Sequence, residues 1–324
     1  MKPSVLVVSW ASEAVLTDLR RHFDVSHVDI FEDGVPDAAE LARLAEGKDG
    51  LLIHMIPVSS DLLVAGKGKL KVLANASAGA DNVDLETATA AGIQVTNTPG
   101  VLTDAVADFG MAMVLAVGRR LGEAERYARA GKLDTFSFPL FWGTALQGET
   151  LGIVGMGRIG QALARRAKGF SIDIAYHNRN PVAPEIEAEL GATWMPFDRL
   201  LAEARFVLLL TPLTPETRHL IGAPELAAMR KDGYLINIAR GPVVHEEALL
   251  TALQEGQIAG AGLDVYEFEP KVTDGLKSLD TVFLTPHIAS ATVQSRHGMI
   301  EIAAANLKAV LFGEPVPNPV NTLD

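Results

Sequence analysis

Short apolar runs alternate with helix-like segments along the first hundred residues. The apolar runs lie at residues 4–8, 50–55, 70–77 and 92–97, and an amphipathic segment occupies residues 12–23. Strands that alternate with helical patterns of ten or more residues are typical of βαβ units on a parallel sheet. Strands in such a sheet are covered on both faces, so continuous apolar runs are expected there. The pattern predicts an α/β domain.

The alternation restarts at Thr150, which predicts a second α/β domain. Strands are expected at residues 150–157, 172–179, 205–212, 233–241, 258–265 and 281–290, and helices at residues 185–190, 245–255 and 292–312. The last of these helices could return to the first domain. A Pro-rich tail follows it.

Between the two blocks, residues 103–130 predict one long helix. Asp104 lies in its first turn and Gly131 just beyond its end. The central run Phe109–Val117 offers no charged face, so the helix must be buried in a core or against a second copy of the chain. A contiguous apolar surface typically marks an association site, and we therefore predict a homodimer formed largely through the second block.

The composition narrows the class of protein. A chain of 324 residues carries 28 Lys and Arg against 40 Asp and Glu, so its net charge of −12 disfavours binding to nucleic acid. The longest apolar run is far shorter than the roughly 20 residues that span a bilayer, and the N-terminus has no signal-peptide pattern, so no membrane partner is expected. No cysteine is present, which suits a reducing compartment, and we expect a cytoplasmic protein.

A glycine motif opens the second block. Gly155, Gly157 and Gly160 match G-x-G-x-x-G, with an apolar strand before them and a helix-like segment after them. In a dinucleotide-binding turn these glycines allow the tight turn, the approach of the pyrophosphate and the close packing of helix on strand. The alternative is an ordinary glycine-rich turn between strand and helix.

The end of the next strand bears on the choice of cofactor. An acidic residue that binds the ribose usually stands about 20 positions after the first glycine, but this chain has Asn178 and Arg179 there. A carboxylate would repel a 2′-phosphate, whereas Arg179 would attract it, so NADP(H) is favoured. The alternative is that Arg179 is a solvated surface residue.

Three further strands end in polar residues. Arg240 follows one, Glu267 and Glu269 follow another, and His287 follows a third. Ligands bind at the carboxyl ends of strands in open α/β sheets, so these groups form a candidate catalytic set. Arginine grips a carboxylate, and a histidine oriented by a carboxylate is a suitable acid near neutral pH.

The second block resembles the D-isomer-specific 2-hydroxyacid dehydrogenase family, and within it the glyoxylate/hydroxypyruvate reductases. The resemblance covers nearly the whole chain and is carried by GIVGMGRIGQALARR, LTPLTPETRHLI, NIARGPVV, GAGLDVYEFEP and TPHIASAT. It implies that Arg240 binds the substrate carboxylate and carbonyl, that His287 donates the proton, and that Glu269, which directly precedes a proline, is its partner.

The resemblance also implies the remaining site residues. Backbone amides at Ala78 and Gly79 would hold the substrate carboxylate, and Trp142 in the FPLFWG loop would wall the pocket of a neighbouring subunit. The chain departs from the family at Ala80, where a Tyr is frequent, which leaves the shape of the pocket open. The implied cofactor contacts are Thr103, Gly155, Gly157, Arg158, Ile159, Gly160, Asn178, Arg179, Thr211, Pro212, Thr217, Ile238, Ala239 and Asp264.

Together these observations predict two Rossmann-like or flavodoxin-like parallel-sheet domains with the active site in the cleft between them. Residues 1–98 with 288–324 are expected to form a substrate-binding lid, and residues 99–287 the dinucleotide-binding domain. The expected reaction reduces a small 2-oxo acid, such as glyoxylate or hydroxypyruvate, with NADPH preferred over NADH and no metal. A 2-ketogluconate or other D-2-hydroxyacid dehydrogenase and, more remotely, a dinucleotide-sensing corepressor are the alternatives.

Overall fold

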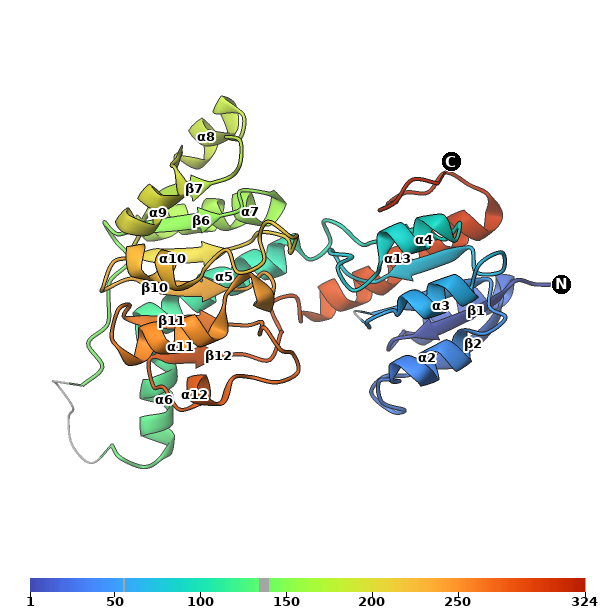
Figure 1. The fold of residues 1–324 in the computed structure, drawn as a ribbon, viewed down its shortest axis with the longest axis horizontal. Coiled ribbons are helices and arrows are strands. Elements are labelled where there is room, and N and C mark those ends of the chain that lie inside the picture. The colour runs from blue at the N-terminus through green and yellow to red at the C-terminus, as the bar shows by residue number, and fades with distance from the viewer. Residues whose placement is uncertain (55, 134–139, 324) are drawn as a thin grey trace. The chain divides into compact units, whose positions relative to one another are not determined.

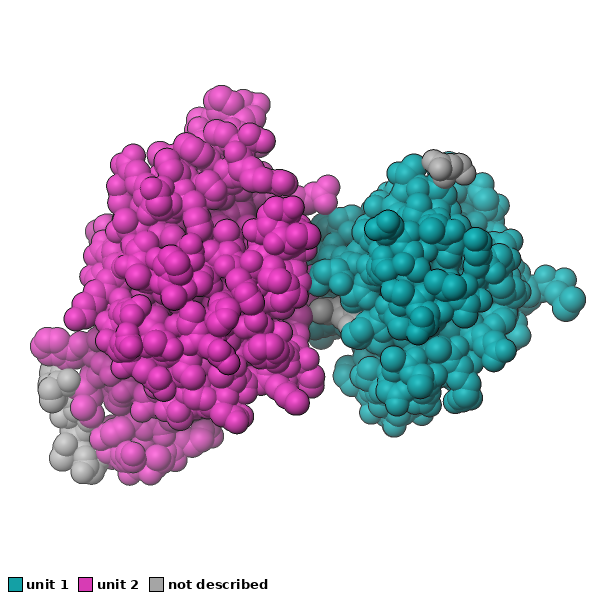
Figure 2. All heavy atoms as spheres, in the orientation of Figure 1, with its two compact units in different colours: residues 1–102, 291–324 teal, residues 103–290 magenta. Residues whose placement is uncertain are grey.

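The computed structural model describes residues 1–54, 56–133 and 140–323. The chain divides into two compact units, one formed by Met1–Leu102 with Ala291–Asp324 and the other by Thr103–Ser290 (Figure 2). Each unit is built on its own parallel sheet, as the alternating pattern predicts.

Unit 1 contains a five-stranded parallel sheet in the order β2-β1-β3-β4-β5, the flavodoxin-like arrangement. Its strands are β1 (Ser4–Val8), β2 (Asp24–Val28), β3 (Gly50–Ile53), β4 (Val72–Asn75) and β5 (Gln94–Thr96). Helices α2, α3 and α4 lie in front of the sheet in Figure 1 and α13 lies behind it. The helices are α1 (Glu13–His22), α2 (Ala38–Ala45), α3 (Ser60–Ala65), α4 (Leu85–Ala90) and α13 (Val293–Phe312).

Unit 2 contains a seven-stranded parallel sheet in the order β12-β11-β10-β9-β6-β7-β8. All strands are parallel, but β7 and β8 are added on one side of β6 and β9 to β12 on the other, so the strand order reverses between β6 and β9. Dinucleotides bind at such a reversal in doubly wound folds. The strands are β6 (Thr150–Val154), β7 (Asp173–His177), β8 (Ala192–Trp194), β9 (Phe206–Leu209), β10 (Tyr234–Asn237), β11 (Gly260–Leu263) and β12 (Val282–Leu284).

Helices cover both faces of this second sheet, with α10 and α11 in front of it and α5 behind it in Figure 1. Helices α5 and α7 pack closely because Gly110 has no side chain: a Cβ there would lie 2.4 Å from Cδ1 of Leu163. The helices of unit 2 are α5 (Thr103–Gly118), α6 (Leu121–Arg129), α7 (Arg158–Ala167), α8 (Pro184–Leu190), α9 (Phe197–Glu203), α10 (Ala223–Ala228), α11 (Glu246–Gln254) and α12 (Asp274–Lys277).

The prediction of one continuous helix over residues 103–130 is wrong. The chain breaks between α5 and α6 at Arg120, whose backbone adopts the left-handed conformation with φ 54°. Most of the run Phe109–Val117 is buried inside unit 2, where α5 packs against β10, β11 and β12. The core of the unit therefore accounts for this apolar run. Neither α5 nor any other helix in the described part of the chain is long and apolar enough to cross a membrane.

Candidate functional site

The glycine motif forms the turn between β6 and α7, and two of its glycines are sterically required. Gly155 has φ 109°, and a Cβ there would lie 2.8 Å from the carbonyl carbon of Leu210. At Gly160 a Cβ would lie 2.4 Å from the carbonyl oxygen of Gly155. A Cβ at Gly157 would meet no atom within 4 Å, so this glycine faces open space at the start of α7. Gly157 thus leaves room for a ligand to approach the backbone.

A cavity of about 490 Å³ lies beside this turn, at the ends of β6, β7 and β9. Its wall includes Thr211, whose hydroxyl is buried and has no hydrogen-bond partner among the described residues. A buried hydroxyl without a partner is costly, and a polar ligand in the cavity would satisfy it. The residues present therefore fit a dinucleotide. The lining consists of Val154, Gly155, Gly157, His177, Asn178, Arg179, Asn180, Leu210, Thr211, Pro212, Thr214, Glu216, Thr217 and Leu220.

Asn178 holds the glycine turn in place. Its side-chain oxygen accepts a hydrogen bond from the Met156 amide at 2.7 Å, while its own carbonyl accepts one from the indole of Trp194 at 3.0 Å. Its carboxamide nitrogen is a donor, which a family acid at this position would not supply. Asn178 therefore both fixes the turn and presents a donor group to the cavity that it lines.

Arg179 is exposed at the rim of the same cavity. Glu216, of opposite charge, also lines this cavity. A hydrogen bond from Thr214 is the main cause that lowers the pKa of Glu216, and the positive charge of Arg179 adds to the effect. The rim thus carries one cation and one anion. Sequence reasoning missed Glu216, which lies 37 positions beyond Arg179.

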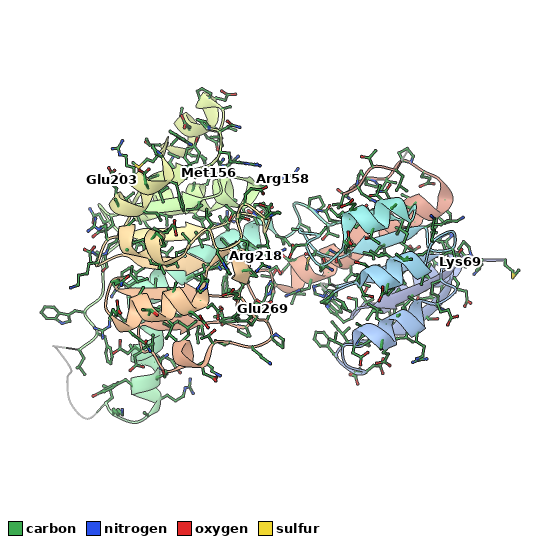
Figure 3. The ribbon with its side chains drawn as sticks, in the orientation of Figure 1. Lys69, Met156, Arg158, Glu203, Arg218 and Glu269 are labelled. Atoms are coloured by element: carbon green, nitrogen blue, oxygen red, sulfur yellow. The ribbon has the colours of Figure 1, made fainter. Side chains whose placement is uncertain are left out.

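The other expected cofactor contacts lie on the same unit. Arg158 and Ile159 open α7 directly after the glycine turn, and Thr103 opens α5. In Figure 3, Arg158, Arg218 and Glu269 lie along one side of unit 2, and Glu203 lies on the opposite side. The hydroxyl of Thr217 donates to the Pro212 carbonyl at 2.7 Å, so Thr217 shapes the wall of the cavity through this turn.

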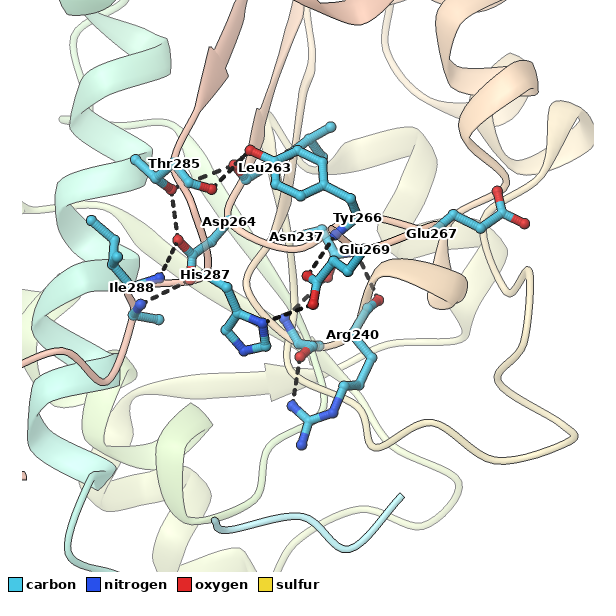
Figure 4. A network of polar contacts seen from close by, with 12 residues as sticks. Asn237, Arg240, Leu263, Asp264, Tyr266, Glu267, Glu269, Thr285, His287 and Ile288 are labelled. Carbon is cyan, nitrogen blue, oxygen red and sulfur yellow. Dashed lines mark hydrogen bonds and ion pairs between the residues drawn. The ribbon is translucent and has the colours of Figure 1, made fainter. Parts of the chain in front are cut away.

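Arg240 stands at the end of β10 on a turn that Asn237 holds. The buried Asn237 side chain donates to the Arg240 carbonyl at 2.9 Å and accepts from the Ala239 amide at 3.0 Å. These two bonds fix Ile238 and Ala239, which lie between Asn237 and Arg240. The Arg240 guanidinium in turn donates to the Ala239 carbonyl at 2.8 Å (Figure 4).

His287 and Glu269 form a hydrogen-bonded pair. Nδ1 of His287 lies 3.1 Å from Oε2 of Glu269, and the other carboxylate oxygen accepts from the Tyr266 amide at 3.0 Å (Figure 4). Burial alone would raise the pKa of Glu269, but the hydrogen bond and charge of His287, the Tyr266 amide and the charge of Arg240 lower it below its usual range. Glu269 is therefore a carboxylate near neutral pH, and it leaves Nε2 of His287 to act on a ligand.

Asp264 holds the loop that carries His287. Its carboxylate is fully buried and accepts bonds from the Thr285 hydroxyl at 2.7 Å, the Ile288 amide at 2.9 Å and the Ala289 amide at 2.8 Å. The Asp264 carbonyl accepts from the amide of His287, whose φ is 54°. Burial raises the pKa of Asp264. These bonds hold the loop of His287 in place, and the cofactor contact that the resemblance implies for Asp264 stays a prediction.

In unit 1, Ala78 and Gly79 lie in the loop after β4. Asn97 donates to the Ala78 carbonyl at 2.7 Å, and Asn75 donates to the Gly79 carbonyl at 3.0 Å. In a trans peptide the N–H points away from the carbonyl, so the amides of Gly79 and Ala80 point away from these asparagines. Binding of the substrate carboxylate by the amides near Ala78 and Gly79 stays a prediction.

Trp142 belongs to unit 2 and is 78% exposed. The preceding part of its expected aromatic loop, residues 136–139, lies outside the described residues.

A glycine turn at the strand-order reversal, with Arg240, Glu269 and His287 at neighbouring strand ends, defines a dinucleotide-dependent oxidoreductase. Residues 111–289 match the NAD binding domain of the D-isomer specific 2-hydroxyacid dehydrogenases. The chain belongs to this family and is an NAD(P)-dependent oxidoreductase.

Relatives match over the full length of the chain. The glyoxylate reductase of Thermococcus onnurineus is 47% identical, covering 99% of this chain and 96% of the relative. The crystal structure of the NADPH-dependent glyoxylate/hydroxypyruvate reductase from Sinorhizobium meliloti with NADP and malonate is 36% identical, with a TM-score of 0.87 over 99% of this chain and 97% of that one. The holo D-mandelate dehydrogenase of Rhodotorula graminis is 27% identical, with a TM-score of 0.89 over 100% and 99%.

Proposed function

We propose that this protein reduces glyoxylate and hydroxypyruvate to the corresponding D-2-hydroxy acids and prefers NADPH to NADH. The observation that carries the proposal is the His287–Glu269 pair, 3.1 Å apart, in the same unit as Arg240 and the glycine turn. Full-length relatives named glyoxylate reductase support the substrate class.

In the proposed reaction, the bound reduced dinucleotide supplies a hydride to the carbonyl carbon of the 2-oxo acid. His287 donates the proton from Nε2 to the carbonyl oxygen, so that the carbonyl becomes a hydroxyl. Glu269 orients the imidazole through Nδ1 and stabilises its charged form. Arg240 stabilises the negative charge that develops on the oxygen before the proton arrives.

The two parts of the chain have different proposed tasks. Residues 1–98 with 288–324 form the substrate-binding domain, and residues 99–287 form the dinucleotide-binding domain. The amides near Ala78 and Gly79 bind the substrate carboxylate. Support comes from the carbonyls of these two residues, which accept bonds from Asn97 and Asn75 and so turn the following amides away from those asparagines. The protein works in the cytoplasm, consistent with a chain that contains no cysteine.

The preference for NADPH rests on Arg179 at the rim of the cavity beside the glycine turn. A 2′-phosphate would gain a charge-assisted hydrogen bond from Arg179, worth roughly 1.5–3 kcal/mol. Glu216 on the same rim opposes this gain by repulsion. The preference is therefore expected at the lower end of about 10- to 100-fold.

A coupled comparison of substrates and cofactors tests this function. Loss of absorbance at 340 nm is followed for glyoxylate, hydroxypyruvate, 2-ketogluconate and phenylpyruvate, each with NADPH and with NADH. The highest kcat/KM is expected for glyoxylate or hydroxypyruvate with NADPH. A higher kcat/KM for either larger acid, or for NADH, would contradict the corresponding part of the proposal.

We also propose that two copies associate through the surface of unit 2 that carries α6, Leu133 and Trp142. No residue of α6 is buried within the chain, and Leu121, Leu133 and Trp142 are 51%, 65% and 78% exposed. Apolar side chains gathered in this way mark association sites. In the dimer, Trp142 walls the partner's substrate pocket. Light scattering at low micromolar concentration tests the association, because a species of 34.5 kDa would contradict it.

A further inference from the structure

Glu267 is a buried carboxylate two positions before Glu269 that serves neither the imidazole nor the cavity. Its side chain is 8% exposed. Glu267 and Glu246, the first residue of α11, form two reciprocal hydrogen bonds, each from the backbone amide of one to the carboxylate of the other. The Glu267 amide donates to Glu246 Oε1 at 2.8 Å, and the Glu246 amide donates to Glu267 Oε2 at 3.0 Å. Figure 4 shows Glu267 extending away from the His287–Glu269 pair. A negative charge at the start of a helix is favourable.

His219 completes this cluster from a third part of the chain. Its Nε2 lies 2.6 Å from Oε1 of Glu267, and its amide donates to the Pro242 carbonyl at 2.8 Å. The His219 ring also meets the ring of His245 edge-on at 4.7 Å. His245 accepts a bond at Nδ1 from the Ala248 amide, so its proton resides on Nε2. The turn that lines the dinucleotide cavity thus continues directly into a residue bound to Glu267.

The cluster joins the two segments that carry the proposed catalytic groups. One segment runs from Arg240 to Glu246, and the other runs from Tyr266 to Glu269. At one end the two backbones abut so closely that a Cβ on Gly241 would lie 1.7 Å from the Tyr266 carbonyl oxygen. At the other end the two Glu246–Glu267 bonds join the segments directly, and His219 bridges them through Pro242 and Glu267.

The position of Glu269 depends on this register. Its carboxylate accepts from the Tyr266 amide, one residue before Glu267, and then contacts His287. A rotation of the Tyr266–Glu267 backbone would therefore turn Glu269 away from the imidazole. Displacements of about 1 Å at a catalytic group cost up to roughly 100-fold in rate.

We propose that Glu267 is a positioning residue for catalysis. Held by His219 and Glu246, Glu267 keeps Glu269 and Arg240 in the arrangement that the reaction needs. This inference rests on the proposed function for its kinetic consequence. The Glu267 carboxylate has two acceptor atoms in use, and glutamine offers only one. Glu267→Gln keeps the size of the side chain, removes its negative charge and replaces one acceptor oxygen by an NH2 donor, so the present pattern of the His219 and Glu246 bonds cannot be kept unchanged.

The kinetic test compares Glu267→Gln with Glu247→Gln, a control that removes an exposed carboxylate from the same first turn of α11. For the full enzyme with NADPH and glyoxylate, Glu267→Gln should lower kcat/KM about 10-fold or more, mainly through kcat, and displace the pH–rate profile. Glu247→Gln should behave as wild type. A Glu267→Gln enzyme with a lowered melting temperature but unchanged kcat and pH profile would overturn the proposal.

His219→Ala provides a second variant in case Glu267→Gln does not fold, because His219 is partly exposed and its removal leaves both Glu246–Glu267 bonds in place. It should displace the pH profile in the same direction by a smaller amount, and an unchanged profile would count against the proposal.

A spectroscopic readout separates this inference from the proposed function. The His287 ring is observed by NMR in protein carrying 15N-labelled histidine, with His287→Gln to assign its signals. Glu267→Gln should alter the titration of the His287 signals, and Glu247→Gln should not. Altered signals in a protein that reduces no 2-oxo acid would refute the function and support the positioning role. Unaltered signals in an active enzyme would refute the positioning role alone.

Discussion

The strand ends at β6 and β7 and those at β10, β11 and β12 hold functional atoms in different ways. Around β6 the working surface is backbone, and the critical positions are glycines that carry no side chain. Around β10 to β12 the working groups are the side chains of Arg240, Glu269 and His287. Buried Asn237 holds the turn of Arg240 and buried Asp264 holds the loop of His287, and we propose a similar supporting role toward Glu269 for Glu267.

This difference predicts how each region responds to substitution. A backbone site fails when an added atom collides with a neighbouring backbone, since the backbone cannot move aside. A side-chain site fails when a charge is removed or turned, even if the fold is intact. Variants of the first region should therefore change cofactor affinity, and variants of the second should change turnover and its dependence on pH.

The largest effect is expected for His287→Ala. The substitution removes the only described group proposed to donate the proton, so kcat should fall by about 10²- to 10⁴-fold. Affinity for NADPH, measured by fluorescence titration, should change little because the imidazole acts on the substrate. A turnover within a factor of ten of wild type would show that another group supplies the proton.

Two alanine variants compare glycines within the backbone site. In Gly160→Ala the new Cβ would lie 2.4 Å from the Gly155 carbonyl oxygen, so α7 must move away from β6. The variant should lose about 1–3 kcal/mol of stability and bind NADPH more weakly. Gly157→Ala meets no protein atom within 4 Å, so it should weaken NADPH binding while its melting temperature stays near that of wild type. Equal melting temperatures for the two variants would contradict the packing argument.

A smaller effect is expected for Arg179→Ala. Loss of the guanidinium at the cavity rim should reduce the ratio of kcat/KM for NADPH over NADH by about tenfold. Arg199→Ala, which removes an exposed arginine paired with Glu203 on α9, is the matched control and should leave the ratio unchanged. An unchanged ratio in Arg179→Ala would assign the 2′-phosphate to other residues.

For Glu269→Gln the expected displacement of the pH–rate profile is modest, although the variant removes the direct partner of His287. The lowered pKa keeps Glu269 charged throughout the working range, so its loss leaves a protonated His287 without its counter-charge. The alkaline limb of the pH–rate profile for reduction should move to lower pH by up to about one unit. Because the folded-state pKa is lowered, this carboxylate stabilises the fold above its ordinary value of 4.5 and less so as the pH falls further. The variant should therefore lose less stability than wild type on acidification, which urea unfolding at several pH values would measure.

Two edge strands, β2 and β8, are not predicted from the sequence, whereas the central strands of both sheets are. The central strands β1, β3 and β4 are continuous apolar runs because both of their faces are covered. Strand β2 (DVSHV) is only partly buried and contains polar residues, so its sequence gives little indication of a strand. It forms because β1 offers it a hydrogen-bonding partner, with Ser4 opposite Asp24.

The helix over residues 103–130 illustrates the same limit. Its composition predicts a continuous helix, although Gly118 and Gly122, which flank Arg120, are unfavourable inside one. The break at Arg120 and the burial of Phe109–Val117 arise from packing on β10 to β12, strands that lie more than a hundred residues further along the chain.

The sequence by itself determined the parts of this protein that depend on neighbouring residues: the alternation of strands and helices, the glycine turn and the polar groups at strand ends. These features follow from local geometry, because a glycine or a strand end has the same meaning wherever it folds. The supporting contacts were decided by tertiary structure alone. Asn178 binds Met156, Asp264 binds the loop of His287, and Glu267 binds His219, and these bonds join residues between 22 and 48 positions apart. Such bonds exist only once the sheet has brought the strand ends to one edge, since buried polar groups find partners through space and not along the chain.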